Sequence, residues 1–214
     1  MTHPYWPFFD LRVCTPRLEL RYPDDHDVTE VMSLAARGIH PPDFMPFGVP
    51  WTRFDNLERQ GMQFHWRARA DLTPEHWDLP LVAVVDGVIV GTQSVSAKDF
   101  AVARTVGTGS WVGQAHQGQG IGKEMRAAVL HLAFEGLGAQ TATSGAFVDN
   151  AASIAVSRAL GYEDDGFEVH ARDGQAARQV RFRLERAEWE ARRRHDIVIE
   201  GLERCLGALG LGGS

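Results

Sequence analysis

The chain has 214 residues, 44% of them hydrophobic, which is enough apolar material to bury the core of one ordinary domain. Its formal net charge of −6 is spread along the sequence, which argues against a dedicated nucleic-acid-binding protein, because such proteins carry a basic face. No segment reaches the roughly 18 apolar residues of a membrane span, and the N-terminal residues lack the pattern of a secretory signal.

The first part of the chain predicts a strand followed by two helices. Apolar and polar residues alternate over residues 17–22, which predicts a strand, and residues 24–38 have helical spacing and end at a glycine. Residues 39–52 are rich in proline and aromatic residues and predict an irregular loop. A second helix is expected over residues 53–72.

The middle of the chain predicts a hairpin and then alternating strands and helices. Residues 79–97 read as two strands joined at Asp86 and Gly87, the strongest short hairpin signal in the sequence. A strand is expected over residues 104–113, and a helix starts at Ile121. Residues 139–149 predict another strand.

A short helix and a second hairpin close the predicted domain. The helix starts at Asn150 and stops at Gly161, and residues 166–185 form the hairpin with a turn over residues 172–175. A helical tail is expected from about Arg186 onward.

The two cysteines carry information about the setting of the protein. Cys14 and Cys205 stand near opposite ends of the chain without metal-ligand spacing. They predict two free thiols, no metal site and a reducing cytoplasm.

The stretch from His116 to Arg126 places glycines at positions 118, 120 and 122 and then continues as a helix. Glycines at a helix N-terminus let a bulky anion approach the unpaired backbone N–H groups, so phosphate is the expected ligand. A Walker A loop is disfavoured, because Gln117 replaces its first glycine and Glu124 its serine or threonine. A dinucleotide fingerprint is also disfavoured, because the spacing is G-x-G-x-G and follows a hairpin.

The spacing Gln117-x-x-Gly120-x-Gly122, together with the strand before it and the helix of residues 150–162, resembles the GNAT superfamily of acyl-CoA-dependent N-acyltransferases. The resemblance covers roughly residues 15–185. It implies an α/β (α+β) fold, with a mixed central sheet of about seven strands flanked by helices and splayed between strands 4 and 5. The domain is expected over residues 1–186, and residues 187–214 would be a helical tail that packs on it or on a second subunit.

The resemblance implies how an acyl-CoA would bind. Backbone groups of Trp111, Val112 and Gly113 would pair with the pantetheine arm, and the N–H of Val112 would stabilise the thioester oxygen as it becomes negative. The side chain of Trp111 is expected to be an ordinary core aromatic. The pyrophosphate would be held by the loop residues Gln117, Gly118, Gln119, Gly120, Ile121, Gly122 and Lys123.

The helix that starts at Asn150 carries three polar residues on one face. Asn150 has the position of an N-cap, and Ser153 and Ser157 follow it at helical spacing. The resemblance implies that Asn150 and Ser153 contact the cofactor and that Ser157 protonates the departing thiolate. The family often has tyrosine there. Serine resembles the branch that acetylates the N-termini of ribosomal proteins, and residues 41–52 and 124–130 are similar to actinobacterial succinyl-CoA transferases.

The proton acceptor of the reaction stays open at this stage. A thioester is attacked by a neutral amine, so the site must remove a proton from the ammonium form. Many relatives have a glutamate two or three residues before this tryptophan, where the chain has Thr108 and Gly109. Glu168, His170 or water are the alternatives, and His116 is expected to be only a loop residue.

The aromatic residues Phe44, Phe47 and Trp51 are expected either to line the acceptor site or to cap a core, and Arg53 is a candidate partner for a carboxylate. The predicted function is transfer of an acetyl or succinyl group from CoA to the primary amine of a small molecule or a peptide N-terminus. The partners would be acyl-CoA, the amine and a second copy of the chain, with no nucleic acid and no membrane. The alternative is a non-catalytic acyl-CoA-binding or sensing module, because the glutamate is missing.

Overall fold

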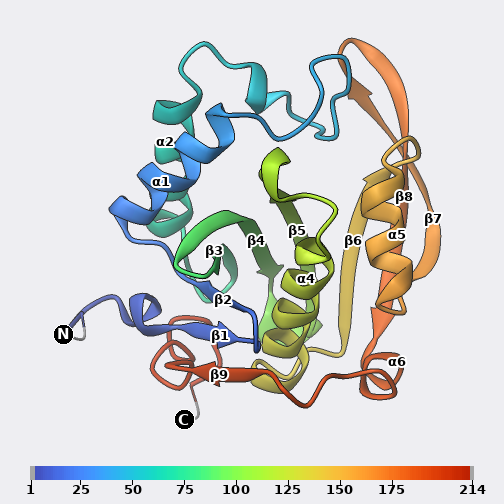
Figure 1. The fold of residues 1–214 in the computed structure, drawn as a ribbon. Coiled ribbons are helices and arrows are strands. Elements are labelled where there is room, and N and C mark those ends of the chain that lie inside the picture. The colour runs from blue at the N-terminus through green and yellow to red at the C-terminus, as the bar shows by residue number, and fades with distance from the viewer. Residues whose placement is uncertain (1–2, 213–214) are drawn as a thin grey trace.

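The computed structural model describes residues 3–212 and has a nine-stranded mixed sheet with helices packed against it (Figure 1). The strand order is β7-β8-β6-β5-β4-β3-β2-β1-β9. Every neighbouring pair is antiparallel except β5 and β6, which are parallel. The predicted mixed α/β fold is therefore confirmed, with nine strands in place of about seven.

The strands are β1 (Arg12–Cys14), β2 (Leu18–Arg21), β3 (His76–Val85), β4 (Val88–Lys98), β5 (Thr105–Val112), β6 (Thr141–Phe147), β7 (Glu163–Arg172), β8 (Gln175–Glu185) and β9 (Val198–Glu200). The α-helices are α1 (Asp25–Ala36), α2 (Leu57–Ala70), α3 (Phe100–Ala103), α4 (Ile121–His131), α5 (Ala151–Ala159) and α6 (Arg186–Glu190). Short 3-10 helices occupy Pro7–Asp10, Trp51–Arg53 and Gln114–His116, and α4 continues into a π-helical turn at Leu132–Gly136.

Both predicted hairpin turns are confirmed. Asp86 and Gly87 join β3 to β4 with φ of 49° and 78°, and Asp173 and Gly174 join β7 to β8 with φ of 51° and 73°. Two successive residues with positive φ define the type I′ turn that matches the twist of a hairpin. Aspartate and glycine adopt this backbone at low cost, which is why the sequence predicted the turns correctly.

The helices form two layers, one on each face of the sheet. Val28, Val31 and Met32 of α1 pack with Val82 and Val84 of β3 and with Met62 of α2. The opposite face of the sheet packs on α4, through apolar residues that include Met125, Ala128 and Val129. Helix α5 lies beside α4, so the helix that follows the glycine loop and the Asn150 helix share this second face (Figure 1).

Strands β5 and β6 separate after a short parallel contact. They are paired only at Thr105 with Thr141, Val106 with Ala142, and Gly107 with Thr143, although β5 continues to Val112 and β6 to Phe147. They are the fourth and fifth strands of the predicted domain, so the sheet opens where the sequence placed the splay.

The C-terminal tail differs from the helix that was predicted. As far as residue 212 it contains the short helix α6 and the strand β9, which pairs antiparallel with β1 at the far edge of the sheet (Figure 1). The strand β9 has only three residues, which is too short for a periodic pattern, and the helical interpretation of this segment was wrong on that account. The tail packs on its own domain, because Ile197, Leu202, Cys205 and Leu209 all belong to the main core. Residues 1–2 and 213–214, the outermost parts of the two predicted segments, lie outside the described residues.

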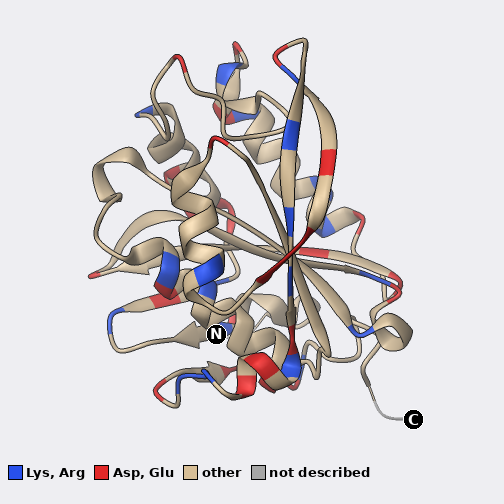
Figure 2. Ribbon diagram, turned by 90° about the vertical axis from the view of Figure 1, so that its right-hand side faces the viewer, with Lys and Arg blue, Asp and Glu red and all other residues tan. Residues whose placement is uncertain are grey.

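Charged residues of both signs are interspersed over the elements (Figure 2). Cys14 and Cys205 are both free thiols. Within residues 3–212, none of the helices combines the length and apolar character that crossing a bilayer requires.

Candidate active site

The opening between β5 and β6 is part of a cleft of about 740 Å³. The α1–α2 loop (residues 37–56), the glycine loop and the start of α5 complete its walls. The predicted site residues that line it are Phe44, Phe47, Trp51, Trp111, Val112, Gln117, Gly118, Gly120, Ile121, Gly122, Lys123, Asn150 and Ser153. Those that do not line it are Gly113, Gln119, Ser157, Glu168 and His170.

The glycine loop has the backbone that its sequence demands. Gly118 and Gly120 have φ of 74° and 77°, in the left-handed region that other residues rarely adopt. Gly120 is the N-cap of α4, so the backbone N–H groups of Ile121, Gly122 and Lys123 begin the helix without intrahelical partners. A Cβ at Gly122 would only touch Val112 at 3.8 Å, so this position is open rather than strained. The loop therefore presents a helix N-terminus to the cleft, as anion binding requires.

The side chain of Gln117 holds the glycine loop in place. Its Nε2 donates to the carbonyl of Val112 at 2.8 Å and to the carbonyl of Ile39 at 2.7 Å. These bonds join the loop to the end of β5 and to the segment after α1. Gln117 thus positions the loop, which is a more specific role than the phosphate contact expected from the sequence.

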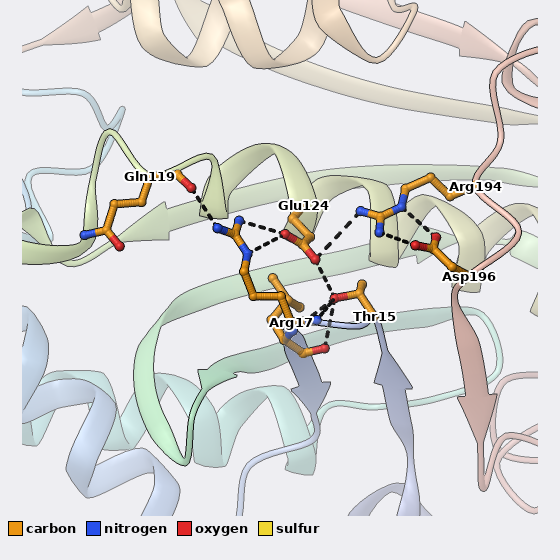
Figure 3. Close-up of polar contacts among 7 residues, drawn as sticks. Thr15, Arg17, Gln119, Glu124, Arg194 and Asp196 are labelled. Carbon is orange, nitrogen blue, oxygen red and sulfur yellow. Dashed lines mark hydrogen bonds and ion pairs between the residues drawn. The ribbon is translucent and has the colours of Figure 1, made fainter.

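A carboxylate on the first turn of α4 anchors the loop to both ends of the chain (Figure 3). Glu124 accepts from the Thr15 hydroxyl at 2.6 Å and from Arg17 Nε at 2.8 Å, and Arg194 lies 3.7 Å away. Arg17 also donates to the carbonyl of Gln119 at 3.0 Å. These cations neutralise the one acidic residue in the first turn of α4, so the helix N-terminus keeps its preference for anions.

The backbone of β5 offers its groups to the opening at alternate residues. The N–H of Gly113 donates to the carbonyl of Val90 on the neighbouring chain segment at 2.9 Å, and His116 donates to the carbonyl of Gly113. Gly113 is therefore already paired, and the prediction that it binds the pantetheine arm is not supported. In an antiparallel pair, the backbone groups of successive residues face alternately toward and away from the partner strand. The backbone N–H and C=O of Trp111 therefore face β4, whereas the N–H groups of Ser110 and Val112 point away from β4 into the opening. Ser110 was missed from the sequence.

Gly113 is glycine for a packing reason. A Cβ there would lie 2.6 Å from Cδ1 of Leu34, so the end of β5 can approach α1 only without a side chain. The Trp111 ring packs on the core beside Trp51, with ring centroids 5.9 Å apart, in agreement with the expected core role.

The polar face of α5 is only partly turned to the cleft. Asn150 caps the helix by accepting from the N–H of Ser153 at 3.1 Å, as its position predicted. Asn150 and Ser153 both line the cleft. Ser157 lies one turn further along, fully buried, and its hydroxyl has no hydrogen-bond partner in the described structure. Such a hydroxyl is costly to bury, which is typical of a group kept for a ligand.

The α1–α2 loop covers one end of the cleft with aromatic side chains. Phe47 and Trp51 have ring centroids 5.2 Å apart and pack against a small core beneath them, so they both line the cleft and cap a core. Arg172 from the last hairpin donates to the carbonyl of Met45 at 3.2 Å, and Arg53 pairs with Asp173 at 3.0 Å. These contacts tie the loop to the turn of the β7–β8 hairpin, and they occupy Arg53.

The two candidate bases on the last hairpin lie outside the cleft. Glu168 and His170 belong to β7, the edge strand of the sheet, where Glu168 is exposed and His170 is half-buried. Glu168 is 3.1 Å from His170 and 3.4 Å from Arg181, so its charge is compensated by its neighbours on the hairpin. Neither residue is placed to take a proton from an amine in the cleft.

The described residues that line the cleft include no aspartate or glutamate. Three histidines are present, His40, His65 and His116. His65 is buried on α2, where burial and nearby Arg69 lower its pKa to about 4, so its imidazole is neutral at pH 7. His65 was missed from the sequence, because its spacing in the helix is that of any inward residue.

The buried cation Arg126 was also missed. It lies on α4, is 3% exposed and lines the cleft, where it donates to hydroxyls on both separated strands, Ser110 of β5 and Ser144 of β6. From the sequence it reads as a polar residue beside the apolar stripe of the helix.

Comparison with known protein families identifies the class to which this fold and cleft belong. Residues 17–163, more than half of the chain, match the family described as the acetyltransferase (GNAT) domain. The chain therefore belongs to the GNAT family and is an enzyme of the acetyltransferase class.

Solved structures with the same fold agree with this assignment. The ribosomal L7/L12 α-N-protein acetyltransferase RimL, in complex with coenzyme A, has 18% identity and a TM-score of 0.66, over 80% of this chain and 95% of that one. The microcin C7 self-immunity acetyltransferase MccE, in complex with acetyl-CoA and AMP, has 21% identity and a TM-score of 0.65, over 79% and 93%. An N-acetyltransferase from Staphylococcus aureus Mu50 has 14% identity and a TM-score of 0.61, over 79% and 98%. At these identities the likeness concerns the fold alone.

Proposed function

We propose that the protein transfers an acyl group from a CoA thioester to a primary amine by direct attack of the amine. The observation that carries the proposal is that one cleft combines a glycine loop at the start of α4 with backbone N–H groups of β5 that point into the opening. The family of the chain and the CoA complexes of its structural neighbours agree with it.

The residues of the cleft suit the parts of an acyl-CoA in turn. The N–H groups of Ile121, Gly122 and Lys123, with the Lys123 ammonium, would hold the pyrophosphate. Asn150 and Ser153 would contact the pantetheine arm. The Ser157 hydroxyl is buried one turn beyond Ser153 and has no partner, so the bound thioester would have to open a path from it to the sulfur.

Each proton and each bond can be assigned in the proposed reaction. The amine nitrogen attacks the thioester carbon, and the Val112 N–H donates to the carbonyl oxygen as it gains negative charge. The carbon–sulfur bond then breaks, and the hydroxyl of Ser157 relays a proton to the departing thiolate, taking a replacement proton from water as it gives up its own. The proton lost by the amine goes to water. His65 is a poor candidate for the base, because a pKa of about 4 means that it does not keep a proton at pH 7.

We infer that the acceptor amine is an α-amine, of a peptide N-terminus or of a small molecule. An α-amine has a pKa near 8 and is partly neutral at physiological pH, whereas a lysine amine at about 10.4 needs a stronger base. No carboxylate among the described lining residues is available as that base. The RimJ/RimL-like branch and the actinobacterial succinyl-CoA branch, acetyl and succinyl donors, a cytoplasmic setting and a homodimer remain parts of this proposal.

A second candidate, a non-catalytic acyl-CoA-binding or sensing module, is favoured by the absence of a carboxylate base among the described residues of the cleft. A free-thiol assay separates the two. Acetyl-CoA and succinyl-CoA are each incubated with a panel of α-amines and lysine amines, and thiol release is compared with that in buffer. Release that depends on an α-amine supports the enzyme. Calorimetric binding of CoA without release for any amine would indicate the module, and sedimentation of the same sample tests the dimer.

A further inference from the structure

We infer that Arg126 makes the enzyme selective for a carboxylate-bearing substrate, either the acyl group of the thioester or the acceptor. The inference rests on the proposed acyl transfer and adds the class of substrate that the cleft prefers.

The first step is the burial of a charge without a counter-charge. Arg126 is 3% exposed, and no ion pair within residues 3–212 includes it. Its Nη1 donates to the hydroxyl of Ser144 at 3.0 Å and its Nη2 to that of Ser110 at 3.2 Å, both neutral groups. Its Nε is buried with no partner among the described residues. A buried guanidinium in this condition is costly unless an anion joins it.

The second step is the position of the guanidinium. Strands β5 and β6 are last paired at Gly107 and Thr143, and Ser110 and Ser144 lie just beyond that point. Arg126 therefore spans the base of the opening, with one edge bonded to each strand, and it is among the residues that line the cleft. Nη1 and Nη2 each carry two N–H donors and use one of them here, so each keeps one N–H for a carboxylate oxygen without breaking the existing bonds.

The third step is the charge of the cleft as a whole. The chain carries 28 aspartate and glutamate residues and a net charge of −6, yet none of these acids is among the described residues that line the cleft. The lining cations are Lys123 at the glycine loop and Arg126 at the base. A polycationic acceptor would meet no carboxylate there. A substrate with one anionic group at the loop and another at the base would meet a cation at each place.

A structural alternative is that Arg126 only braces the two strands. The hydroxyl of Thr108, which donates to the carbonyl of Thr143 at 3.1 Å, already provides a neutral brace at the same place. Bracing would not require a charge, and a neutral side chain would avoid the cost of burying one. The two roles differ in what the charge does to substrate choice.

The experiment measures selectivity for a carboxylate in two arms. In the donor arm, kcat/KM is measured for succinyl-CoA and for its uncharged amide analogue with one fixed amine. In the acceptor arm, acetyl-CoA is fixed, and the α-amines of aspartate and asparagine dipeptides are compared. We expect the carboxylate substrate to be favoured about 10- to 100-fold in one arm, which identifies its source.

The variants test whether Arg126 causes that preference. Arg126→Gln should reduce the ratio to about one, whereas Arg126→Lys, which keeps the charge, should retain part of it. Lys123→Gln is the matched control, because it removes a lining cation at the other end of the cleft. It should weaken every thioester alike and leave the ratio unchanged.

Two outcomes overturn the inference, and a separate one refutes the proposed function. A wild-type ratio near one in both arms overturns the inference, even if Arg126→Gln fails to fold. An unchanged ratio in a folded Arg126→Gln enzyme also overturns it and assigns Arg126 to the brace. If wild type binds CoA thioesters and transfers acyl groups in either case, the proposed function stands. Failure to bind any CoA thioester would instead refute the function itself.

Discussion

Replacing Arg17 by methionine should weaken CoA binding, although Arg17 does not line the cleft. Arg17 donates from Nε to Glu124 at 2.8 Å and from Nη1 to the carbonyl of Gln119 at 3.0 Å, and its Nη2 lies 2.7 Å from Glu124 (Figure 3). Its loss frees one side of the glycine loop. It also leaves the Glu124 carboxylate, on the first turn of α4, with only Thr15 and the more distant Arg194 among its described partners.

The size of the effect follows from the burial of the pair. The Glu124 side chain is 11% exposed and that of Arg17 46%, so the ion pair is neither fully screened nor fully desolvated. A charge-assisted, two-point contact of this kind contributes about 1–2 kcal/mol. We therefore expect Arg17→Met to lower the free energy of unfolding by about 1–2 kcal/mol. A loss of about 1 kcal/mol in binding raises the Kd for CoA about fivefold.

Calorimetry with CoA on Arg17→Met and wild type provides the measurement. Arg158→Met is the matched control, because Arg158 pairs with Asp164 at 2.9 Å on an exposed face, and its loss changes net charge equally. We expect its Kd to stay within twofold of wild type. Glu124→Gln should weaken CoA less than Arg17→Met, since it removes the uncompensated charge together with the anchor. A folded Arg17→Met protein with wild-type affinity would refute the anchoring role.

Four further predictions concern single residues. Ser157→Ala should lower kcat by about 10- to 1000-fold and leave the Kd within about threefold, and because this buried hydroxyl has no partner, denaturant melts should show no loss of stability; single-turnover rates equal to wild type would make it a bystander. Gly120→Glu, at φ of 77°, should raise the Kd for CoA at least about tenfold, whereas Gly122→Ala, which has room, should bind normally in calorimetry. Burial raises the pKa of Asp78 to about 6. The stability that this favoured protonated form contributes is therefore fully present below the unfolded pKa of 3.8 and is lost as pH rises through 6. Asp78→Asn should add about 1–3 kcal/mol to the free energy of unfolding at pH 7 in thermal melts, and no gain there would contradict the burial argument. Leu209→Ala should cost about 2–4 kcal/mol in urea unfolding, because Leu209 is fully buried, and a cost near zero would show the tail to be idle.

Features determined by neighbouring residues were predictable from the sequence. The Asp-Gly turns, the Asn150 cap and the glycines that end α1 and α5, Gly38 and Gly161, each suit a particular backbone angle, and all were found where the sequence predicted them. The match of residues 17–163 to the GNAT family also confirmed the resemblance based on the glycine loop.

Features determined by distant contacts were not predictable. The pairing of β1 with β9 joins two three-residue strands from opposite ends of the chain, which are too short for a periodic pattern. The prediction also named Glu168 and His170 as possible bases, because chain order alone does not show that β7 forms an outer edge. Arg126 and His65 have ordinary helical positions, and only the packing of α4 and α2 against the sheet reveals that they line the cleft.

The opening between β5 and β6 is held at a fixed width by side chains, since no backbone ladder crosses it beyond Gly107 and Thr143. Thr108, Ser144 and Arg126 make bonds across or alongside the gap, and Arg126 does so from a helix that is itself packed in the core. A ligand that enters a gap held in this way pays little for ordering the protein. The α1–α2 loop differs, because its described contacts with the last hairpin are few and partly exposed. We therefore expect the width of the thioester channel to be set by the sheet and α4, and access of the acceptor by the loop.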